Sequence, residues 1–298
     1  MMELPRLKDI CTGMGGLSYG YLQAGFEVEK GIDIWDVALK TYNKYIGKGV
    51  HQNLADYYPT RGDYDIIVVG GTPCQDFSLK NKHRNIYSKR SQLVLDFCRI
   101  VKAMQPVAFM FENVIHLSKW AEVALLEMPG YKVTKNLVDM SQYGVPQARH
   151  RKIFIGCKGK HLVLRPPAGL TRLTVRDAFD EIPENWGYTK HRPETVEKFT
   201  RMHSTQWTSK EGLSDYKGII RLQWDQPSCG IVNVKKAQIL HPGEDRVITL
   251  AEALVLQGFP PWYVPEGTDT EKAIQIANAV PPRLAYHIAN QLKRMVLH

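Results

Sequence analysis

Two short apolar runs end in residues that can do covalent chemistry. The run at 66–69 leads through Pro73 to Cys74, and a turn after a strand is a place where a thiol can meet a substrate. The run at 107–111 leads directly to Glu112, a carboxyl group that can donate or accept a proton. A cysteine and an acid placed in this way predict nucleophilic catalysis with proton transfer.

Two further groups complete this set. Arg149 and Arg151 can bind a carbonyl oxygen or lower the pKa of a nearby thiol. The glycine-rich turn at 13–16 follows the first apolar run and lets the backbone approach a ligand closely. This turn lacks the third glycine of the dinucleotide pattern, and the carboxylate Asp33 follows the second run. We therefore expect a nucleoside cofactor without a pyrophosphate, such as S-adenosylmethionine.

Each feature also has an ordinary structural interpretation. A single buried cysteine is usually inert packing, and an acid at a strand end or an Arg-x-Arg pair is commonly surface charge. Residues 16–20 match the G-x-S-x-G pattern of serine hydrolases, but no oxyanion motif precedes them. We therefore disfavour an esterase, and the argument for catalysis depends on the joint occurrence of the four groups.

Composition limits the class of protein. The chain has 298 residues, 44% of them hydrophobic, with 39 Lys and Arg against 30 Asp and Glu. A net charge of +9 suits a polyanionic partner such as nucleic acid. The five cysteines include no C-x-x-C pair, so we expect free thiols and no metal site. No apolar stretch is long enough for a membrane span, so we expect a cytoplasmic, nucleoid-associated protein.

Short apolar runs alternate with amphipathic segments in the first half of the chain. This alternation predicts an α/β fold with a doubly wound, mostly parallel sheet, whose ligands bind at the carboxyl ends of the strands. The clearest helix is predicted at 92–104, and another over 273–297, which should pack back on the sheet. We expect strands at Leu7–Cys11, Val28–Ile32, Asp65–Val69, Val107–Phe111, Tyr131–Val138 and Lys152–Cys157.

The pattern changes after residue 169, where aromatic and basic residues interleave and the periodicity weakens. We expect two units. A catalytic and cofactor-binding domain comprises 1–174 and 269–298, and a smaller target-recognition domain comprises 175–268.

Six segments, in this order, resemble the motifs of the DNA (cytosine-5-)methyltransferase family in its bacterial and phage form. They are Asp9–Gly16, Gly70–Ser78, Glu112–Val114, Gln142–Arg151, Arg246–Pro260 and Gln275–Pro282. The resemblance implies the S-adenosylmethionine-dependent, Rossmann-like fold and methyl transfer to C5 of a cytosine. It makes Cys74 the nucleophile that adds to C6, Glu112 the partner of N3, Arg151 the ligand of O2 and Arg149 a support for Cys74 or the base.

The resemblance also assigns binding residues. It implies that the cofactor, S-adenosyl-L-methionine, is bound by Cys11, Gly13, Met14, Gly16, Asp33, Ile34, Asn53, Leu54, Pro73, Leu93, Asn278 and Ala279. Residues 77–92 correspond to a loop that closes over double-stranded DNA, and the family flips the target base out of the duplex. The expected DNA contacts are Gln75, Ser78, Lys80, Lys82, Arg84 and Arg90.

Several positions depart from the family pattern. Cys11 replaces a Phe beside the adenine, Asn53 replaces an Asp, and Asp33 replaces a Glu. Gly230 and Ile231 stand where a Thr-Leu or Thr-Ile pair is expected. Two alternatives stay open: an RNA cytosine methyltransferase on the same fold, and a catalytically silent DNA-binding relative. We expect a monomer without a metal or membrane partner, and a cognate restriction endonuclease is one partner that the resemblance allows.

Overall fold

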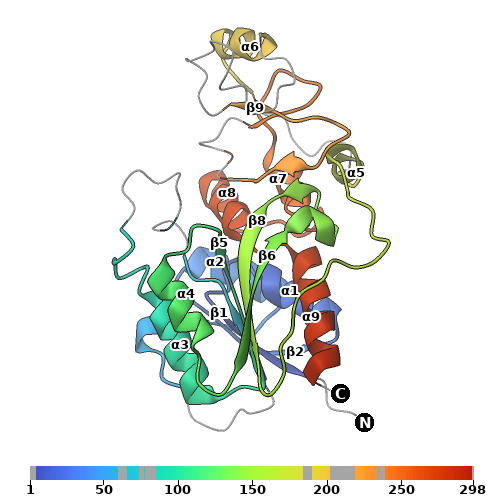
Figure 1. The fold of residues 1–298 in the computed structure, drawn as a ribbon. Coiled ribbons are helices and arrows are strands. Elements are labelled where there is room, and N and C mark those ends of the chain that lie inside the picture. The colour runs from blue at the N-terminus through green and yellow to red at the C-terminus, as the bar shows by residue number, and fades with distance from the viewer. Residues whose placement is uncertain are drawn as a thin grey trace.

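The computed structural model describes residues 5–59, 66–73, 77, 85–183, 190–201, 219–232, 234 and 239–296. Its centre is a seven-stranded sheet with helices on both faces (Figure 1). In sheet order the strands are β3 (Gly49–His51), β2 (Glu27–Asp33), β1 (Arg6–Ile10), β4 (Ile66–Gly70), β5 (Ala108–Val114), β8 (His150–Cys157) and β6 (Lys132–Asp139). The six predicted strands are therefore confirmed, with ends shifted by a few residues.

The first five strands in this order, β3, β2, β1, β4 and β5, are parallel to their neighbours. The strand β8 is antiparallel to both β5 and β6. The predicted motifs were expected at the carboxyl ends of strands, but Arg149 and Arg151 lie at the amino end of β8. Because β8 runs the other way, its amino end meets the carboxyl end of β5, and Arg151 pairs with Val114. The arginines therefore reach the expected edge of the sheet.

Successive side chains of a strand point to opposite faces of the sheet, so each central strand contributes to two core clusters, one on each face. In β5, Ala108 and Met110 point to one face, and Phe109 and Phe111 point to the other. The second face is covered by α3 (Leu93–Met104) and α4 (Lys119–Leu126). The helix α3 confirms the prediction at 92–104, and its left-handed end at Gln105 precedes Pro106.

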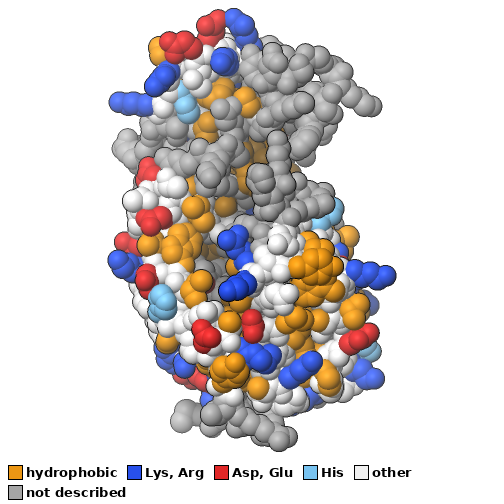
Figure 2. Space-filling model, turned by 90° about the vertical axis from the view of Figure 1, so that its left-hand side faces the viewer, with side chains coloured by type: hydrophobic (Ala, Val, Ile, Leu, Met, Phe, Trp, Pro, Cys, Tyr) orange, Lys and Arg blue, Asp and Glu red, His pale blue; other side chains and the backbone are white. Residues whose placement is uncertain are grey.

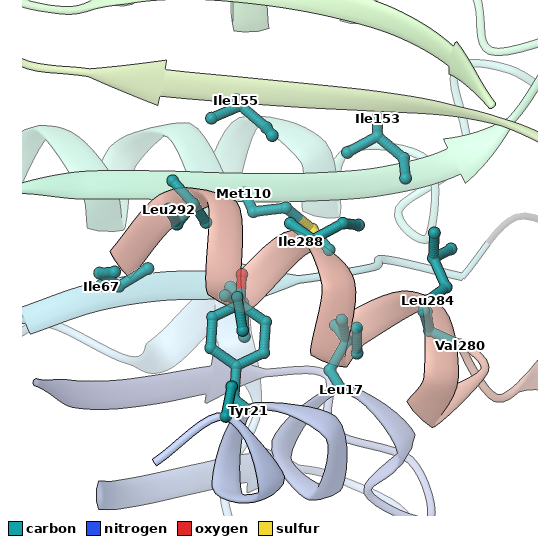
Figure 3. Close-up of a cluster of buried hydrophobic side chains, with 14 of the residues drawn as sticks. Leu17, Tyr21, Ile67, Met110, Ile153, Ile155, Val280, Leu284, Ile288 and Leu292 are labelled. Carbon is teal, nitrogen blue, oxygen red and sulfur yellow. The ribbon is translucent and has the colours of Figure 1, made fainter. Parts of the chain in front are cut away.

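The other face is covered by α1 (Gly16–Gln23) and the last helix, α9 (Pro282–Val296), which pack side by side. Figure 3 shows Leu284, Ile288 and Leu292 of α9 reaching the same cluster as Tyr21 and Met110. The predicted return of the chain end to the sheet is confirmed.

The single predicted helix over 273–297 is wrong in one respect. The structure has α8 (Asp269–Asn278) and α9, separated by an extended break at Ala279–Pro281. Proline lacks a backbone N–H and disfavours helical geometry in the residue before it, so the consecutive prolines at 281 and 282 stop one helix and start the next.

The remaining elements are one ten-residue helix and several shorter segments. They are α2 (Asp36–Tyr45) beside β2, η1 (Leu54–Asp56), η2 (Met140–Tyr143), β7 (Gln147–Ala148), α5 (Val175–Phe179), α6 (Pro193–Thr200), β9 (Ile220–Arg221), β10 (Ser228–Cys229), β11 (Ile239–Leu240) and α7 (Leu250–Leu256). β10 pairs with β7, and β11 pairs with β9. Two-residue strands explain why the hydrophobic periodicity weakens after residue 169.

The upper part of the molecule in Figure 1, with α6 and β9, is held by a buried guanidinium group. Arg221 donates to the carbonyl oxygens of His241 and Glu244 at 2.9 and 2.8 Å, and to that of Phe199 at 2.8 Å. A small apolar cluster of Phe199, Leu240 and Val247 lies beside it. The guanidinium group of Arg221 thus joins the short strand β9 to the end of α6 and to the segment that follows β11.

The contact between α1 and α9 depends on glycine. A Cβ atom added at Gly20 would lie 2.4 Å from the carbonyl oxygen of Pro282 and 2.5 Å from Cβ of Ala285. We predict that Gly20→Ala destabilises the fold by about 1–2 kcal/mol, because the clash outweighs the roughly 1 kcal/mol gain in helix propensity. Urea unfolding followed by circular dichroism measures this change. The exposed Gln23→Ala in the same helix is the control, and equal stability of the two variants would contradict the packing argument.

Candidate active site

The glycine-rich turn after β1 is fixed by backbone hydrogen bonds. The amide of Gly13 donates to Oδ2 of Asp33 at 2.8 Å, and the amide of Gly15 donates to the carbonyl oxygen of Thr12 at 3.0 Å. Gly13 and Gly15 both have positive φ, at 53° and 97°. A Cβ atom on Gly13 would meet nothing within 4 Å, so the turn faces open space there. The turn that the sequence predicts to bind a ligand therefore has a fixed backbone with open space beside Gly13.

Asp33 ends β2 and braces this turn. Its second carboxylate oxygen accepts from the amide of Trp35 at 2.9 Å. The next residue, Ile34, is 58% exposed, which is unusual for an isoleucine beside a core strand. Asn53 caps η1 by accepting from the amide of Ala55 at 3.1 Å. Three candidate ligand groups therefore lie at or after the ends of the neighbouring strands β2 and β3. They are the carboxylate of Asp33, the exposed side chain of Ile34 and the amide oxygen of Asn53.

The other expected cofactor residues differ in accessibility. Met14, Leu54 and Ala279 are buried, whereas Asn278 is exposed. Gly16 lies against the carbonyl oxygen of Val280, and a Cβ atom on it would come within 2.0 Å of that oxygen. The last motif therefore contacts the first one directly. Cys11, Pro73 and Leu93 are half-buried.

Cys11 adopts a left-handed backbone conformation, with φ of 60°. Burial, together with the charge of Asp33, raises the pKa of its thiol well above the ordinary range. Cys11 is therefore a neutral thiol that lines the turn.

Ser18, in the serine-hydrolase pattern, is buried within α1. Its hydroxyl donates to Oδ2 of Asp9 at 2.6 Å and lies 2.9 Å from the hydroxyl of Tyr42. Burial raises the pKa of the Asp9 carboxyl to about 7, although the hydrogen bond from Ser18 opposes this shift. A buried hydroxyl that holds a carboxyl group cannot attack a substrate, so the pattern is structural here.

The predicted nucleophile, Cys74, lies outside the described residues, as do Gln75, Ser78, Lys80, Lys82 and Arg84. The segment before it, Gly71–Pro73, is described and is held by Asn113. The side-chain amide of Asn113 donates to the carbonyl oxygen of Thr72 at 3.1 Å, while its oxygen accepts from the amide of Val114 at 2.9 Å. Of the expected DNA contacts, Arg90 is described and is exposed.

Glu112 and Arg151 form an ion pair at this edge of the sheet. Nε of Arg151 lies 3.1 Å from Oε1 of Glu112, and the glutamate is 9% exposed. A Cβ atom on Gly71 would lie 3.3 Å from Oε2 of Glu112, so a glycine leaves room for the carboxylate next to the Thr72–Pro73 segment. The structure thus brings an acid and an arginine beside the described segment that precedes Cys74.

Arg149 has a different set of contacts. Its guanidinium group donates to the carbonyl oxygens of Ile231 at 2.8 Å and Ala277 at 3.0 Å. These contacts connect the residue to the region after β10 and to α8. The expected support of Cys74 by Arg149 stays a prediction.

The motif at 246–260 supplies a buried ion pair. Arg246 donates to both carboxylate oxygens of Glu252, at 2.8 and 2.7 Å, and Glu252 also closes a capping box with Thr249 at the start of α7. The sequence argument missed Tyr263, whose buried hydroxyl donates to the carbonyl oxygen of Met14 at 2.6 Å. Residues 249 apart in sequence offer no local signal of this contact.

Within the described part of the chain, no group of three or more His, Cys, Asp or Glu side chains is arranged to hold a metal ion. None of its helices combines the length and apolar character needed to cross a bilayer.

Comparison with known proteins agrees with this geometry. The model of the C-5 cytosine-specific DNA methylase family matches residues 6–294. The chain belongs to this family. The methyltransferase M.HgiDI of Herpetosiphon aurantiacus is 32% identical over 96% of this chain and 93% of its own length. M1.HphI of Haemophilus parahaemolyticus is 31% identical over 96% and 86%. Both are named type II methyltransferases. The family shows that this protein is a DNA cytosine-5 methyltransferase.

Solved structures share the fold of this C-5 methylase. A prophage-encoded protein of E. coli has a TM-score of 0.81 at 24% identity and covers 99% of this chain and all of its own. The Dnmt2 methyltransferase of S. pombe has a TM-score of 0.65 at 18% identity, covering 98% of this chain and 99% of its own. At these identities the likeness establishes the fold. The family and the fold imply a methyl donor of the S-adenosylmethionine type.

Asn113 offers a test of the segment that leads to the predicted nucleophile, Cys74. In Asn113→Asp the residue loses its donor to Thr72 and places a carboxylate against a carbonyl oxygen. We predict a fall in kcat of roughly 10- to 100-fold, with DNA affinity changed by less than about threefold. The substitution displaces the segment 71–73 that leads to Cys74, whereas the proposed DNA contacts are unchanged.

The matched control is Asn136→Asp. Asn136 is also buried, donates to the carbonyl oxygen of Ile153 and accepts from the amide of Leu164, but it lies on β6. Steady-state methylation with a radioactive methyl donor measures both variants. An equal effect on kcat in the two would mean that Asn113 acts through general stability.

Proposed function

We propose that this DNA cytosine-5 methyltransferase acts through a covalent bond between Cys74 and C6 of a flipped-out cytosine in a short duplex site. The observation that carries the proposal is the Glu112–Arg151 pair, which lies beside the Gly71–Pro73 segment leading to Cys74. A carboxyl group next to a nucleophile is what activation of a cytosine ring requires.

The order of bond changes follows from the chemistry of the ring. The Cys74 thiolate adds to C6, and Glu112 supplies the proton that N3 takes up, so that C5 becomes the nucleophilic carbon of an enamine. After C5 is methylated, water takes the C5 proton, the electrons of the C5–H bond form the C5–C6 double bond as the sulfur leaves C6 as a thiolate, and N3 returns its proton to Glu112. Arg151 forms an ion pair with Glu112, and its proposed second role is to donate to O2 of the base.

The residues around the glycine-rich turn fit S-adenosyl-L-methionine. The open space at Gly13 admits a ligand against the backbone, and the carboxylate of Asp33 is the expected acceptor for ribose hydroxyls. Exposed Ile34 offers an apolar surface to a purine, and exposed Asn278 lies at the end of α8. When bound, the cofactor supplies the methyl group.

Basic residues supply the proposed DNA contacts. Figure 2 shows one face of the molecule, on which Lys and Arg side chains lie near the middle, between the upper and lower parts. Arg90 is exposed three residues before α3 and follows the basic segment 78–84 in the sequence. Phosphate neutralisation by such residues gives sequence-independent affinity, and base flipping makes C5 accessible. We assign target recognition to 175–268 and the catalytic domain to 1–174 and 269–298.

Three broader proposals rest on the type II relatives. A cognate restriction endonuclease is the proposed partner in the cell, since methylation of its site protects host DNA from cleavage. A monomer suits a reaction on one strand at a time. A chromosomal substrate would place the enzyme at the nucleoid.

Expression in a methylation-free bacterial host tests the function. We predict that bisulfite sequencing of host DNA finds protected cytosines in one short motif, and that Cys74→Ser abolishes this protection. Cys98→Ser is the matched control, because the buried thiol of Cys98 donates to the carbonyl oxygen of Ala124 and a hydroxyl can do the same. Complete bisulfite conversion with folded wild-type protein present would exclude the proposed substrate.

The covalent step has its own test. We predict that a duplex with 5-fluorocytosine at the methylated position forms an adduct that survives denaturing gel electrophoresis, since fluorine cannot leave as the C5 proton does. Cys74→Ser should form none, and Glu112→Gln should form it about 10²- to 10⁴-fold more slowly, the usual range for loss of a general acid. A wild-type enzyme that methylates the ordinary duplex but leaves no adduct would refute attack at C6.

A further inference from the structure

Two buried glutamines connect the region after β10 to the segment after α8. The amide of Ile231 donates to Oε1 of Gln147 at 2.8 Å, and Nε2 of Gln147 donates to Oε1 of Gln257 at 2.7 Å. Nε2 of Gln257 then donates to the carbonyl oxygen of Ala279 at 2.5 Å. Three hydrogen bonds thus join four segments that are distant in the sequence.

The orientation of this chain of amides is determined. An amide group has one oxygen acceptor and one nitrogen donor, and the chain begins at a backbone N–H and ends at a backbone carbonyl. If either Gln147 or Gln257 were turned over, two donors or two acceptors would face each other. Both side chains have no exposed surface, so water cannot repair such a mismatch.

The two ends of the chain belong to different functional segments. Ile231 follows β10 within the region assigned to target recognition. Ala279 stands in the extended break between α8 and α9, one residue before Val280, whose carbonyl oxygen contacts Gly16 of the glycine-rich turn. Arg149 makes a second connection between the same two regions, through the carbonyl oxygens of Ile231 and Ala277.

We propose that Gln257 is a positioning residue that fixes the cofactor segment at Ala279 relative to the recognition segment at Ile231, so that DNA binding and cofactor binding strengthen each other. The inference rests on the proposed function, because it takes residues 278–279 as cofactor ligands. Gln257 contacts neither substrate. It acts through the two backbone groups at the ends of the chain.

The isosteric Gln257→Glu gives a pH-dependent test. A protonated carboxylic acid can replace the amide, since its O–H donates to Ala279 and its carbonyl accepts from Gln147. The carboxylate lacks that donor. Burial raises the pKa of such a group above the ordinary value for glutamate. Cofactor affinity of this variant should therefore be near that of the wild type at pH 6 and fall by about tenfold at pH 8.5, and Gln257→Met should be weak at both pH values.

Isothermal titration with S-adenosylhomocysteine measures the affinity, with and without a duplex that carries the methylated site. The ratio of the two dissociation constants is the coupling between the sites, and it is the same whichever ligand binds first. We expect the duplex to tighten cofactor binding at least about fivefold in the wild type, and this factor to fall at least threefold in Gln257→Met. The remaining coupling between the two sites should come from Arg149, which still contacts the carbonyl oxygens of Ile231 and Ala277 in this variant.

Gln275→Glu is the matched control. Gln275 is equally buried, accepts from the hydroxyl of Thr41 at 2.7 Å and donates to the carbonyl oxygen of Glu266 at 2.8 Å, but its described contacts do not reach the recognition segment. Its coupling factor should equal that of the wild type. The proposal is overturned if Gln257→Met keeps the wild-type factor, or if Gln275→Glu loses it equally. A wild-type protein that does not bind S-adenosylhomocysteine would instead refute the proposed function.

Discussion

The contact between the backbone of Gly16 and the carbonyl oxygen of Val280 is the constraint on which the site depends. It joins the start of α1 to the break before α9, and a single added methyl group would not fit there. The same two helices then pack along their length, with Gly20 against Pro282 and Ala285. The first motif of the sequence is therefore positioned by the last one, and the start of α1 packs against the segment that precedes α9.

The reversed strand β8 has a comparable consequence for the acid. In a wholly parallel sheet, a motif before a strand would lie at the edge opposite the ligands. Because β8 is antiparallel to β5, Arg151 comes to the carboxyl end of β5 and pairs with Glu112. The acid and its partner are thus held by paired backbone strands, and the adjoining Asn113 holds the segment that leads to Cys74.

The sheet could be predicted from the sequence because buried parallel strands are continuous apolar runs, and helix α3 because its apolar residues recur with helical spacing. The direction of β8 could not, since an antiparallel strand in this place has the same apolar pattern. The break at Ala279–Pro281 had a local signal in Pro281 and Pro282. The position of the candidate site, at the carboxyl ends of the parallel strands, was predicted because the motifs follow the predicted strands. Contacts such as Gln257 with Gln147 join residues 110 apart, and no spacing rule reveals them.

Polar groups buried between segments have a particular value in this fold. An apolar contact tolerates sliding, whereas a buried amide that lacks its partner costs about 1–3 kcal/mol, so hydrogen bonds between Gln147, Gln257 and Ala279 permit one relative position of their segments. The hydrogen bond from the Tyr263 hydroxyl to the carbonyl oxygen of Met14 imposes the same restriction on the glycine-rich turn. An enzyme that transfers a methyl group to C5 of a cytosine must align the base with the methyl donor and needs such fixed positions, because a small misplacement lowers the rate more than it lowers the affinity.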